Sequence, residues 1–364
     1  MFYQNFMRPL LFTLDAERAH EMMMSVSKAV SLNKSLLRLI RPVMDYESDA
    51  LDQNILGIKF RNPVGVAAGF DKNGMVLPLI EALGFGFAEI GSITAQPSPG
   101  NPFPRLFRLK KDRSIINRMG LNNDGAKTVV KRLSKATTNL PLGINIAKTN
   151  APSLKGDSAI EDYLTSYHEA SKIADYITIN ISCPNTDSGK TFEDPQALSE
   201  LLASLNLKSD ARQKPTFLKF SVDLSREELL ELLAISEKNG VDGYVVANTS
   251  SRRNKLLTSR EELNKIGAGG LSGRAIAEKS TRMVRWIYEE INGNKPIIGV
   301  GGIDSVEEAL NKIRAGADLL QVYSGLIFEG PALAKRINRG IHEHLKSRGL
   351  NTIHQLREMD RQPV

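Results

Sequence analysis

Eight short apolar runs, separated by segments of helical pattern, restrict the possible fold of this chain more than any other feature. The intervening segments repeat apolar residues at helical spacing, as in residues 225–239, 275–292 and 304–315. Continuous apolar strands that alternate with helices indicate a parallel sheet. Eight such units fit a closed α/β barrel, the (β/α)8 TIM barrel, better than an open sheet. The predicted strands are residues 64–68, 87–91, 142–147, 176–182, 216–221, 243–247, 296–300 and 319–323.

The first 45 residues have a different pattern and predict an N-terminal helical extension. Asp15 is a suitable N-cap, and Pro42 is expected to end the region. An apolar stripe at helical spacing contains Ala19, Met22, Met23, Val26 and Val30. Periodicity alone favours a helical cap on the barrel over a membrane-surface element. We therefore divide the chain into a helical region (1–45), a barrel (46–345) and a polar C-terminal tail (346–364), with a small hairpin at 54–60.

Composition narrows the choice of partners. The chain has 48 Lys and Arg against 41 Asp and Glu, a net charge of +7, and its basic residues are interleaved with acidic ones. This distribution favours solvated surface charge and an anion site over a nucleic-acid groove. The single cysteine excludes an intrachain disulfide and a multi-cysteine metal site, and we expect no bound metal.

The location of the protein is also an expectation from sequence. No apolar stretch reaches about 18 residues, so we predict no transmembrane helix. Asp15, Glu17 and Glu21 fall where the apolar core of a signal peptide would continue. We expect a cytoplasmic protein that can contact a membrane from that side.

Polar residues gather where the predicted strands end, which is where TIM barrels carry their chemistry. A ring of asparagines suits a flat heterocycle with amide edges, and the lysines suit anionic groups. The glycine pair at 301–302 and Ser324-Gly325 before the last helix match the usual phosphate site of the fold, with a flexible loop at 267–273 nearby. The strand-end residues are Lys72, Asn145, Lys148, Asn180, Asn185, Lys219, Asn248 and Thr249.

Several longer motifs carry a resemblance to a known family. They are residues 67–74 (AAGFDKNG), 99–108 (PGNPFPRLFR), 116–123 (INRMGLNN), 269–273 (GGLSG) and 299–303 (GVGGI). Together they resemble the dihydroorotate dehydrogenase family over about residues 1–345. Residues 14–20 (LDAERAH) resemble its quinone-linked, membrane-associated class 2 branch, in which N-terminal helices form an apolar quinone tunnel.

The resemblance implies FMN as cofactor and oxidation of dihydroorotate to orotate in pyrimidine biosynthesis. It implies peripheral attachment to the cytoplasmic side of the cell membrane, with quinone as acceptor and no nucleic-acid partner. His20 and Arg108 would lie at the quinone tunnel. The implied substrate residues are Lys72, Asn117, Arg118, Met119, Gly120, Leu121, Asn180, Asn185, Asn248 and Thr249. The implied FMN residues are Ala68, Gly69, Lys72, Ser92, Asn145, Asn180, Lys219, Ala247, Gly273, Gly302, Tyr323 and Ser324.

Cys183 is the predicted catalytic base, with Thr186 as a proton relay. A lone cysteine is often an inert core residue, but the context Asn-x-x-Cys-Pro-Asn at a strand end favours catalysis. Class 2 members usually have serine here, and cysteine is typical of the soluble class 1 branch. A thiol has an ordinary pKa of about 8.5, so it is a more accessible base than a serine hydroxyl.

Three other functions stay open from sequence alone. A soluble class 1-like enzyme would use fumarate or an NAD-linked partner and would lack the N-terminal helices. An FMN barrel that reduces uridines in transfer RNA would bind RNA with a steep salt dependence. A non-catalytic membrane-binding protein would be colourless after purification.

Overall fold

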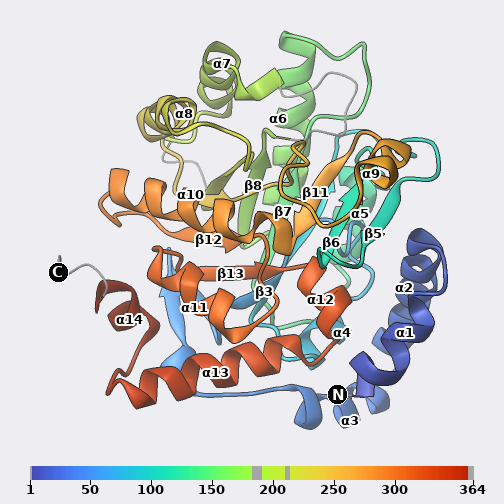
Figure 1. The fold of residues 1–364 in the computed structure, drawn as a ribbon. Helices are drawn as coiled ribbons and strands as arrows, with labels where there is room; N and C mark the ends of the chain where they lie inside the picture. Colours follow the sequence, from blue (N-terminus) through green and yellow to red (C-terminus); the bar gives the residue numbers. More distant parts are fainter. Residues whose placement is uncertain (1, 183–190, 210–213, 360–364) are drawn as a thin grey trace.

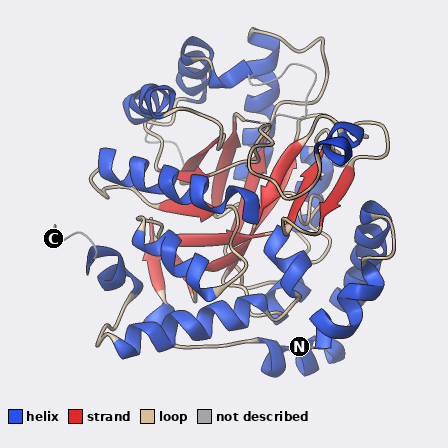
Figure 2. Cartoon of the chain, viewed as in Figure 1, coloured by secondary structure: helices blue, strands red, loops and turns tan. Residues whose placement is uncertain are grey.

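A computed structural model describes residues 2–182, 191–209 and 214–359. Its centre is a closed barrel of eight parallel strands that neighbour one another in chain order, which confirms the predicted fold. Figure 2 shows the strands in the middle of the molecule with helices around them. The barrel strands are β3 (Val64–Val66), β4 (Phe87–Ile93), β7 (Leu142–Ile146), β8 (Tyr176–Asn180), β9 (Thr216–Phe220), β10 (Gly243–Val246), β12 (Ile297–Val300) and β13 (Leu319–Val322).

Helices follow the barrel strands and cover the outside of the barrel. The predicted segments 225–239 and 304–315 form α8 and α11, and 275–292 begins as the short 3₁₀ turn η4 (Arg274–Ile276) before α10. Ser225 and Glu228 form a capping box that fixes the start of α8. These helices are α4 (Leu77–Ala82), α5 (Ala126–Leu133), α6 (Asp157–Ser171), α7 (Pro195–Leu205, after η3, Thr191–Glu193), α8 (Arg226–Lys238), α10 (Ala277–Glu290), α11 (Val306–Arg314), α12 (Ser324–Glu329) and α13 (Leu333–Ser347). The short helix α9 (Arg260–Ile266) packs instead on Leu109, Ile116 and Leu271.

The barrel interior has an apolar layer below a polar one. Alternate residues of a strand point to the same side, so every second position faces inward. The apolar layer contains Phe87, Tyr176, Phe217 and Leu319. The hairpin of β1 (Gln53–Ile55) and β2 (Ile58–Phe60) packs against this layer, as its Phe60 ring contacts Phe87. The hairpin, which the sequence predicts, therefore closes the N-terminal end of the barrel and leaves the opposite end for the site.

A second sheet, which the sequence analysis did not predict, stands at that opposite end. It joins β5 (Leu106–Leu109), β6 (Ser114–Asn117) and β11 (Gly270–Gly273) in antiparallel order. The expectation of a flexible loop at 267–273 is therefore wrong for its last four residues. Their backbone groups pair with β6, which lies far away in the chain.

The N-terminal region is helical and lies against one side of the barrel (Figure 1). It contains the π-helical turn η1 (Tyr3–Met7), α1 (Arg8–Leu11), α2 (Ala16–Ser31) and α3 (Lys34–Met44), followed by η2 (Asp49–Leu51). Asp15 caps α2 by accepting hydrogen bonds from the N–H groups of Glu17 and Arg18, as predicted. Pro42 does not end the helical region, because α3 continues to Met44. A proline this close to a helix end removes only one backbone hydrogen bond, so the helix tolerates it.

The C-terminal segment, expected to be a polar tail, contains α14 (Ile353–Met359). Ile353 and Leu356 are buried, and Arg357 forms an ion pair with Asp318. Two apolar side chains in a polar stretch were too weak a signal to predict this helix.

Candidate active site

Two cavities open side by side at the C-terminal ends of the barrel strands. The glycine cavity is lined mainly by the ends of β10, β11, β12 and β13, including Gly273, Gly301, Gly302 and Ser324. The asparagine cavity is lined by the ends of β3, β4, β8 and β9 and by residues 117 and 119–122. Both share the residues Ala68, Lys219, Asn248, Thr249, Ser272 and Tyr323. The shared residues make the two cavities one continuous site.

The structure brings most of the sequence-predicted site residues to these two cavities. Those lining one or both are Ala68, Gly69, Lys72, Ser92, Asn117, Met119, Gly120, Leu121, Asn180, Lys219, Ala247, Asn248, Thr249, Gly273, Gly302, Tyr323 and Ser324. Asn145 is fully buried and donates to Glu89. Cys183, Asn185 and Thr186 lie outside the described residues.

Arg118 is the described substrate residue that does not line the site. Its guanidinium donates to the backbone oxygens of Pro104, Ile266 and Ala268. It also stacks on the Phe107 ring, 4.6 Å from the ring centroid. Asn117 and Arg118 are neighbours at the end of β6, so their side chains point to opposite sides. The structure therefore does not bring the Arg118 side chain to either cavity.

Three lining residues with polar side chains were missed by sequence reasoning. Ser272 lines both cavities and shares a 2.8 Å hydrogen bond with Ser324. Gln321 lines the glycine cavity, and Asn122 lines the asparagine cavity. Gln321 could have been found as the polar residue in the otherwise apolar run of β13. Ser272 lies inside the quoted motif GGLSG, and Asn122 lies inside INRMGLNN.

Lys219 places a buried positive charge in the floor of the site. Its side chain is 5% exposed and donates no hydrogen bond to any residue within the described ranges. Burial lowers the pKa of Lys219, and the nearby Glu89 carboxylate opposes that shift. A buried ammonium without a hydrogen-bond acceptor is costly, which indicates that a bound molecule supplies one.

Lys72 provides a second cation in the asparagine cavity. Burial, reinforced by the positive charge of Arg105, lowers the pKa of Lys72 to about 8, while Glu17 and Glu21 act in the opposite direction. The ammonium is therefore the main form at neutral pH, but it titrates close to that range. This lysine can attract an anionic group and loses that ability at moderately alkaline pH.

A third cavity lies between the N-terminal helices and the barrel, and we refer to it as the N-terminal cavity. Its volume is about 340 Å³, and most of its lining is apolar side chains of α2 and of the neighbouring α3, α4, α12, β5 and β6, with the polar His20 and Arg108 also lining it. Burial and the charge of Lys72 lower the pKa of His20 to about 4, so the imidazole is neutral at physiological pH. The Arg108 guanidinium donates to the backbone oxygens of Leu11 and Leu14 and fixes the start of α2.

The same helices also expose large apolar side chains to solvent. They are Phe2, Phe6, Leu10, Leu14, Met22, Val26, Leu32, Leu36, Leu39 and Val43. Within the described residues, no helix is both long enough and apolar enough to cross a bilayer.

A short aromatic layer separates the N-terminal cavity from the strand-end site. The Phe70 ring packs edge-on against Tyr323, with ring centroids 5.8 Å apart, and against His20 at 6.4 Å. Tyr323 lines both strand-end cavities, whereas Phe70 and His20 line the N-terminal cavity. Molecules bound on the two sides would therefore be separated only by the rings of Phe70, Tyr323 and His20.

Comparison with known proteins agrees with this arrangement. A protein from Christiangramia forsetii named dihydroorotate dehydrogenase (quinone) is 39% identical over 343 residues, covering 94% of this chain and 99% of its own length. A protein of the same name from Chloroflexus aurantiacus is 40% identical and covers 95% of this chain and 98% of its own length. A crystal structure of DHODH from Eimeria tenella in complex with ferulenol superposes with a TM-score of 0.84 at 32% identity, over 96% of each chain. The sequence profile of the family described as dihydroorotate dehydrogenase matches residues 50–345. The chain therefore belongs to the dihydroorotate dehydrogenase family.

Proposed function

We propose that this protein oxidises dihydroorotate to orotate with bound FMN and passes the electrons to a quinone. The observation that carries the proposal is the pair of sites on either side of the Phe70–Tyr323 layer. One site is polar and cationic, as a charged heterocycle requires, and the other is apolar. Electron transfer from one substrate to the other through a flavin needs this arrangement, and the quinone-linked relatives support the choice of acceptor.

The residues of the glycine cavity fit FMN. Backbone N–H groups of Gly302 and of the turn into α12, together with the Ser324 hydroxyl, would hold the phosphate. Lys219 would hold the flavin ring and balance the negative charge of its reduced form. When bound, FMN supplies the hydride acceptor and the route for electrons to leave.

The glycine backbone at the phosphate site gives a direct test. Gly302 has φ +77°, and a Cβ there would lie 2.4 Å from the Cβ of Ala277. Gly302→Ala combines this overlap with backbone strain of about 1–2 kcal/mol, so we expect FMN affinity to fall roughly tenfold or more. Gly57→Ala is the matched control, because Gly57 has φ +79° with nothing within 4 Å of the added Cβ. Fluorescence titration of apoprotein with FMN measures both; equal affinities in the two variants would remove Gly302 from the phosphate site.

Lys72 and the asparagines of the asparagine cavity would hold dihydroorotate. The Lys72 ammonium would pair with the substrate carboxylate, and Asn117, Asn180, Asn248 and Thr249 would bond the amide edges of the ring. Met119, Gly120 and Leu121 would close over the ring from the loop that follows β6.

The low pKa of Lys72 predicts pH-dependent binding of the product orotate. Lys72 is charged below its pKa of about 8 and neutral above it. If only the charged form pairs with the carboxylate, the dissociation constant of orotate rises about tenfold for each pH unit above the pKa of Lys72 in the ligand-free protein. Titrations of the holoenzyme with orotate across that range, followed by flavin absorbance, measure this. In Lys72→Gln we expect weak binding without the alkaline loss; an unchanged pH profile in this variant would contradict the assignment.

Cys183 and Thr186 complete the proposed chemistry. Dihydroorotate loses a proton from C5 and a hydride from C6 when it becomes orotate. We assign the proton to the Cys183 sulfur, with Thr186 passing it outward and Asn185 beside the substrate. This assignment rests on the sequence context at the end of β8.

The N-terminal cavity is the proposed quinone site, and the exposed apolar face of the helices the proposed membrane contact. An apolar cavity that begins among membrane-facing helices gives a lipid-soluble quinone an entrance without crossing water. We propose peripheral attachment on this basis, on the cytoplasmic side that the family resemblance implies.

Arg108 allows the quinone step to be tested apart from substrate oxidation. Arg108→Gln removes the hydrogen bonds that hold residues Leu11 and Leu14. We expect flavin reduction by dihydroorotate to stay unchanged and reoxidation by quinone to slow about tenfold or more. Lys111→Gln, an exposed neighbour, is the control. Stopped-flow absorbance measures the rates of both half-reactions. An equal loss of rate in both would contradict the assignment of the N-terminal cavity to quinone.

A further inference from the structure

A continuous chain of hydrogen bonds runs from the barrel interior to the asparagine cavity. Asn248 Nδ2 donates to Asn180 Oδ1 at 3.1 Å, and Asn180 Nδ2 donates to Ser92 Oγ at 3.0 Å. Ser92 Oγ donates to Asn145 Oδ1, and Asn145 Nδ2 donates to Glu89 Oε1 at 2.8 Å. Ser92, Asn180 and Asn248 line the cavity, whereas Asn145 and Glu89 are fully buried below it.

Glu89 terminates the chain inside the barrel. Its other carboxylate oxygen accepts from Gln321 Nε2 at 2.7 Å, from Thr178 Oγ1 at 3.2 Å and from the Tyr176 hydroxyl at 3.3 Å. Burial and the Glu89 charge raise the pKa of Tyr176, so this hydroxyl stays a donor. With four donors directed at it, Glu89 acts as an acceptor only.

An acceptor at one end determines the orientation of each group after it. Asn145 must turn its NH₂ toward Glu89, so its oxygen faces Ser92. The Ser92 hydroxyl must give its single proton to Asn145, so it can accept only from Asn180 and from a ligand. Asn180 must then turn its NH₂ toward Ser92, so its oxygen faces Asn248. Amide and hydroxyl groups without such an anchor can adopt either orientation.

The fixed orientation of Ser92 and Asn180 determines which hydrogen-bonding groups they offer to a ligand. Ser92 offers the cavity an acceptor, and Asn180 offers it the second N–H of its amide. An acceptor next to a donor matches the N–H and C=O of a ring amide, a group that dihydroorotate, orotate and the flavin share. In the reversed orientation Ser92 would give its proton to the Asn180 oxygen, so both residues would offer the cavity acceptors only, and the donor of the pattern would be lost.

We propose that Glu89 is a positioning residue that fixes the direction of this hydrogen-bond chain and thereby sets the donor–acceptor pattern offered to a ring amide. The inference rests on the proposed function, because that function supplies the two ring ligands. Glu89 touches neither ligand in this account and acts through Asn145 and Ser92.

The test moves the carboxylate from position 89 to position 145 of the hydrogen-bond chain. In Glu89→Gln the new amide can donate to Asn145, so the chain can reverse with little change of volume. In Glu89→Gln/Asn145→Asp, position 145 again accepts from Ser92 and position 89 donates to it, which restores the original direction. Glu161→Gln, at an exposed position of α6, is the control. For each protein, fluorescence titration gives the dissociation constant of FMN, flavin absorbance gives that of orotate, and thermal unfolding reports the fold.

We expect Glu89→Gln to weaken binding of FMN, orotate or both by about tenfold, and the double variant to recover to within about threefold of the unchanged protein. Unchanged affinities in Glu89→Gln would overturn the proposal. Equal losses in the single and double variants would overturn it too, since the carboxylate would then matter only for packing. If the unchanged protein binds FMN but no orotate, the proposed substrate is wrong, and the FMN affinities alone decide the role of Glu89.

Discussion

Replacing Cys183 with alanine is expected to slow reduction of the bound flavin by dihydroorotate about 10²–10⁴-fold, the usual contribution of a general base. The proton at C5 would then lose its proposed acceptor. The flavin content should stay normal, because Lys219, Gly302 and Ser324, which are proposed to hold FMN, come from other strand ends. Rapid anaerobic mixing with dihydroorotate measures the reduction rate directly. Full turnover in a flavin-loaded Cys183→Ala protein would remove the cysteine from the mechanism.

Cys183→Ser, a second variant at the same position, tests whether the strength of the base matters. Serine is a weaker base, so we expect the serine variant to stay active with its pH profile displaced to higher pH. The unchanged protein should keep activity at lower pH than the variant. Superimposable profiles would show that the base strength of this side chain does not limit the rate.

Lys219→Met is the second substitution with a large expected effect. Methionine fills the space of the lysine stem but removes the buried charge that would face the reduced flavin. Loss of one preorganised electrostatic contact of this kind typically costs about 10²–10³ in rate, and we expect that loss in flavin reduction. The reduction potential of the flavin should fall as well, because its negative reduced form loses a counter-charge.

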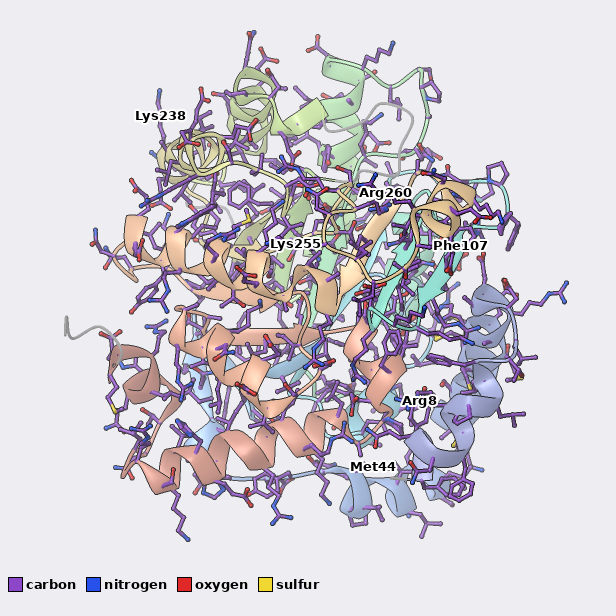
Figure 3. All side chains as sticks on the ribbon, in the orientation of Figure 1. Arg8, Met44, Phe107, Lys238, Lys255 and Arg260 are labelled. Atoms are coloured by element: carbon purple, nitrogen blue, oxygen red, sulfur yellow. The ribbon has the colours of Figure 1, made fainter. Side chains whose placement is uncertain are left out.

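Lys238→Met is the matched control for Lys219→Met. Lys238 lies at the solvent-exposed end of α8, at the edge of the molecule in Figure 3. We expect its rate and potential to match those of the unchanged protein. A Lys219→Met protein with bound FMN and an unaltered potential would show that Lys219 does not face the flavin.

The barrel could be predicted from sequence because the pattern that indicates each strand and helix lies within a few consecutive residues. Each strand is a mainly apolar run of three to seven residues, and helical periodicity follows it. The sheet of β5, β6 and β11 could not be predicted, since its pairing joins Ser114–Asn117 with Gly270–Gly273 across a large part of the chain. Short strands without alternation give no sign of a partner that far away.

The candidate site shows the same limit at the level of single residues. Motifs identified the right segments, but they did not say which side chain of a segment faces inward. Asn117 lines the cavity while Arg118 points away, and the strand alternation decides between them. Glu89 shows the reverse case: a carboxylate in the middle of an apolar strand is a strong signal, but its meaning depends on partners from β7, β8 and β13.

Anaerobic mixing with dihydroorotate, followed by addition of quinone or of fumarate, tests the central proposal most directly. The yellow absorbance of the purified protein should bleach on mixing with dihydroorotate and return with quinone but not with fumarate. Recovery only with fumarate would place the protein with the soluble branch and leave the N-terminal cavity without its proposed role. Failure of dihydroorotate to bleach a protein that contains flavin would contradict the account itself.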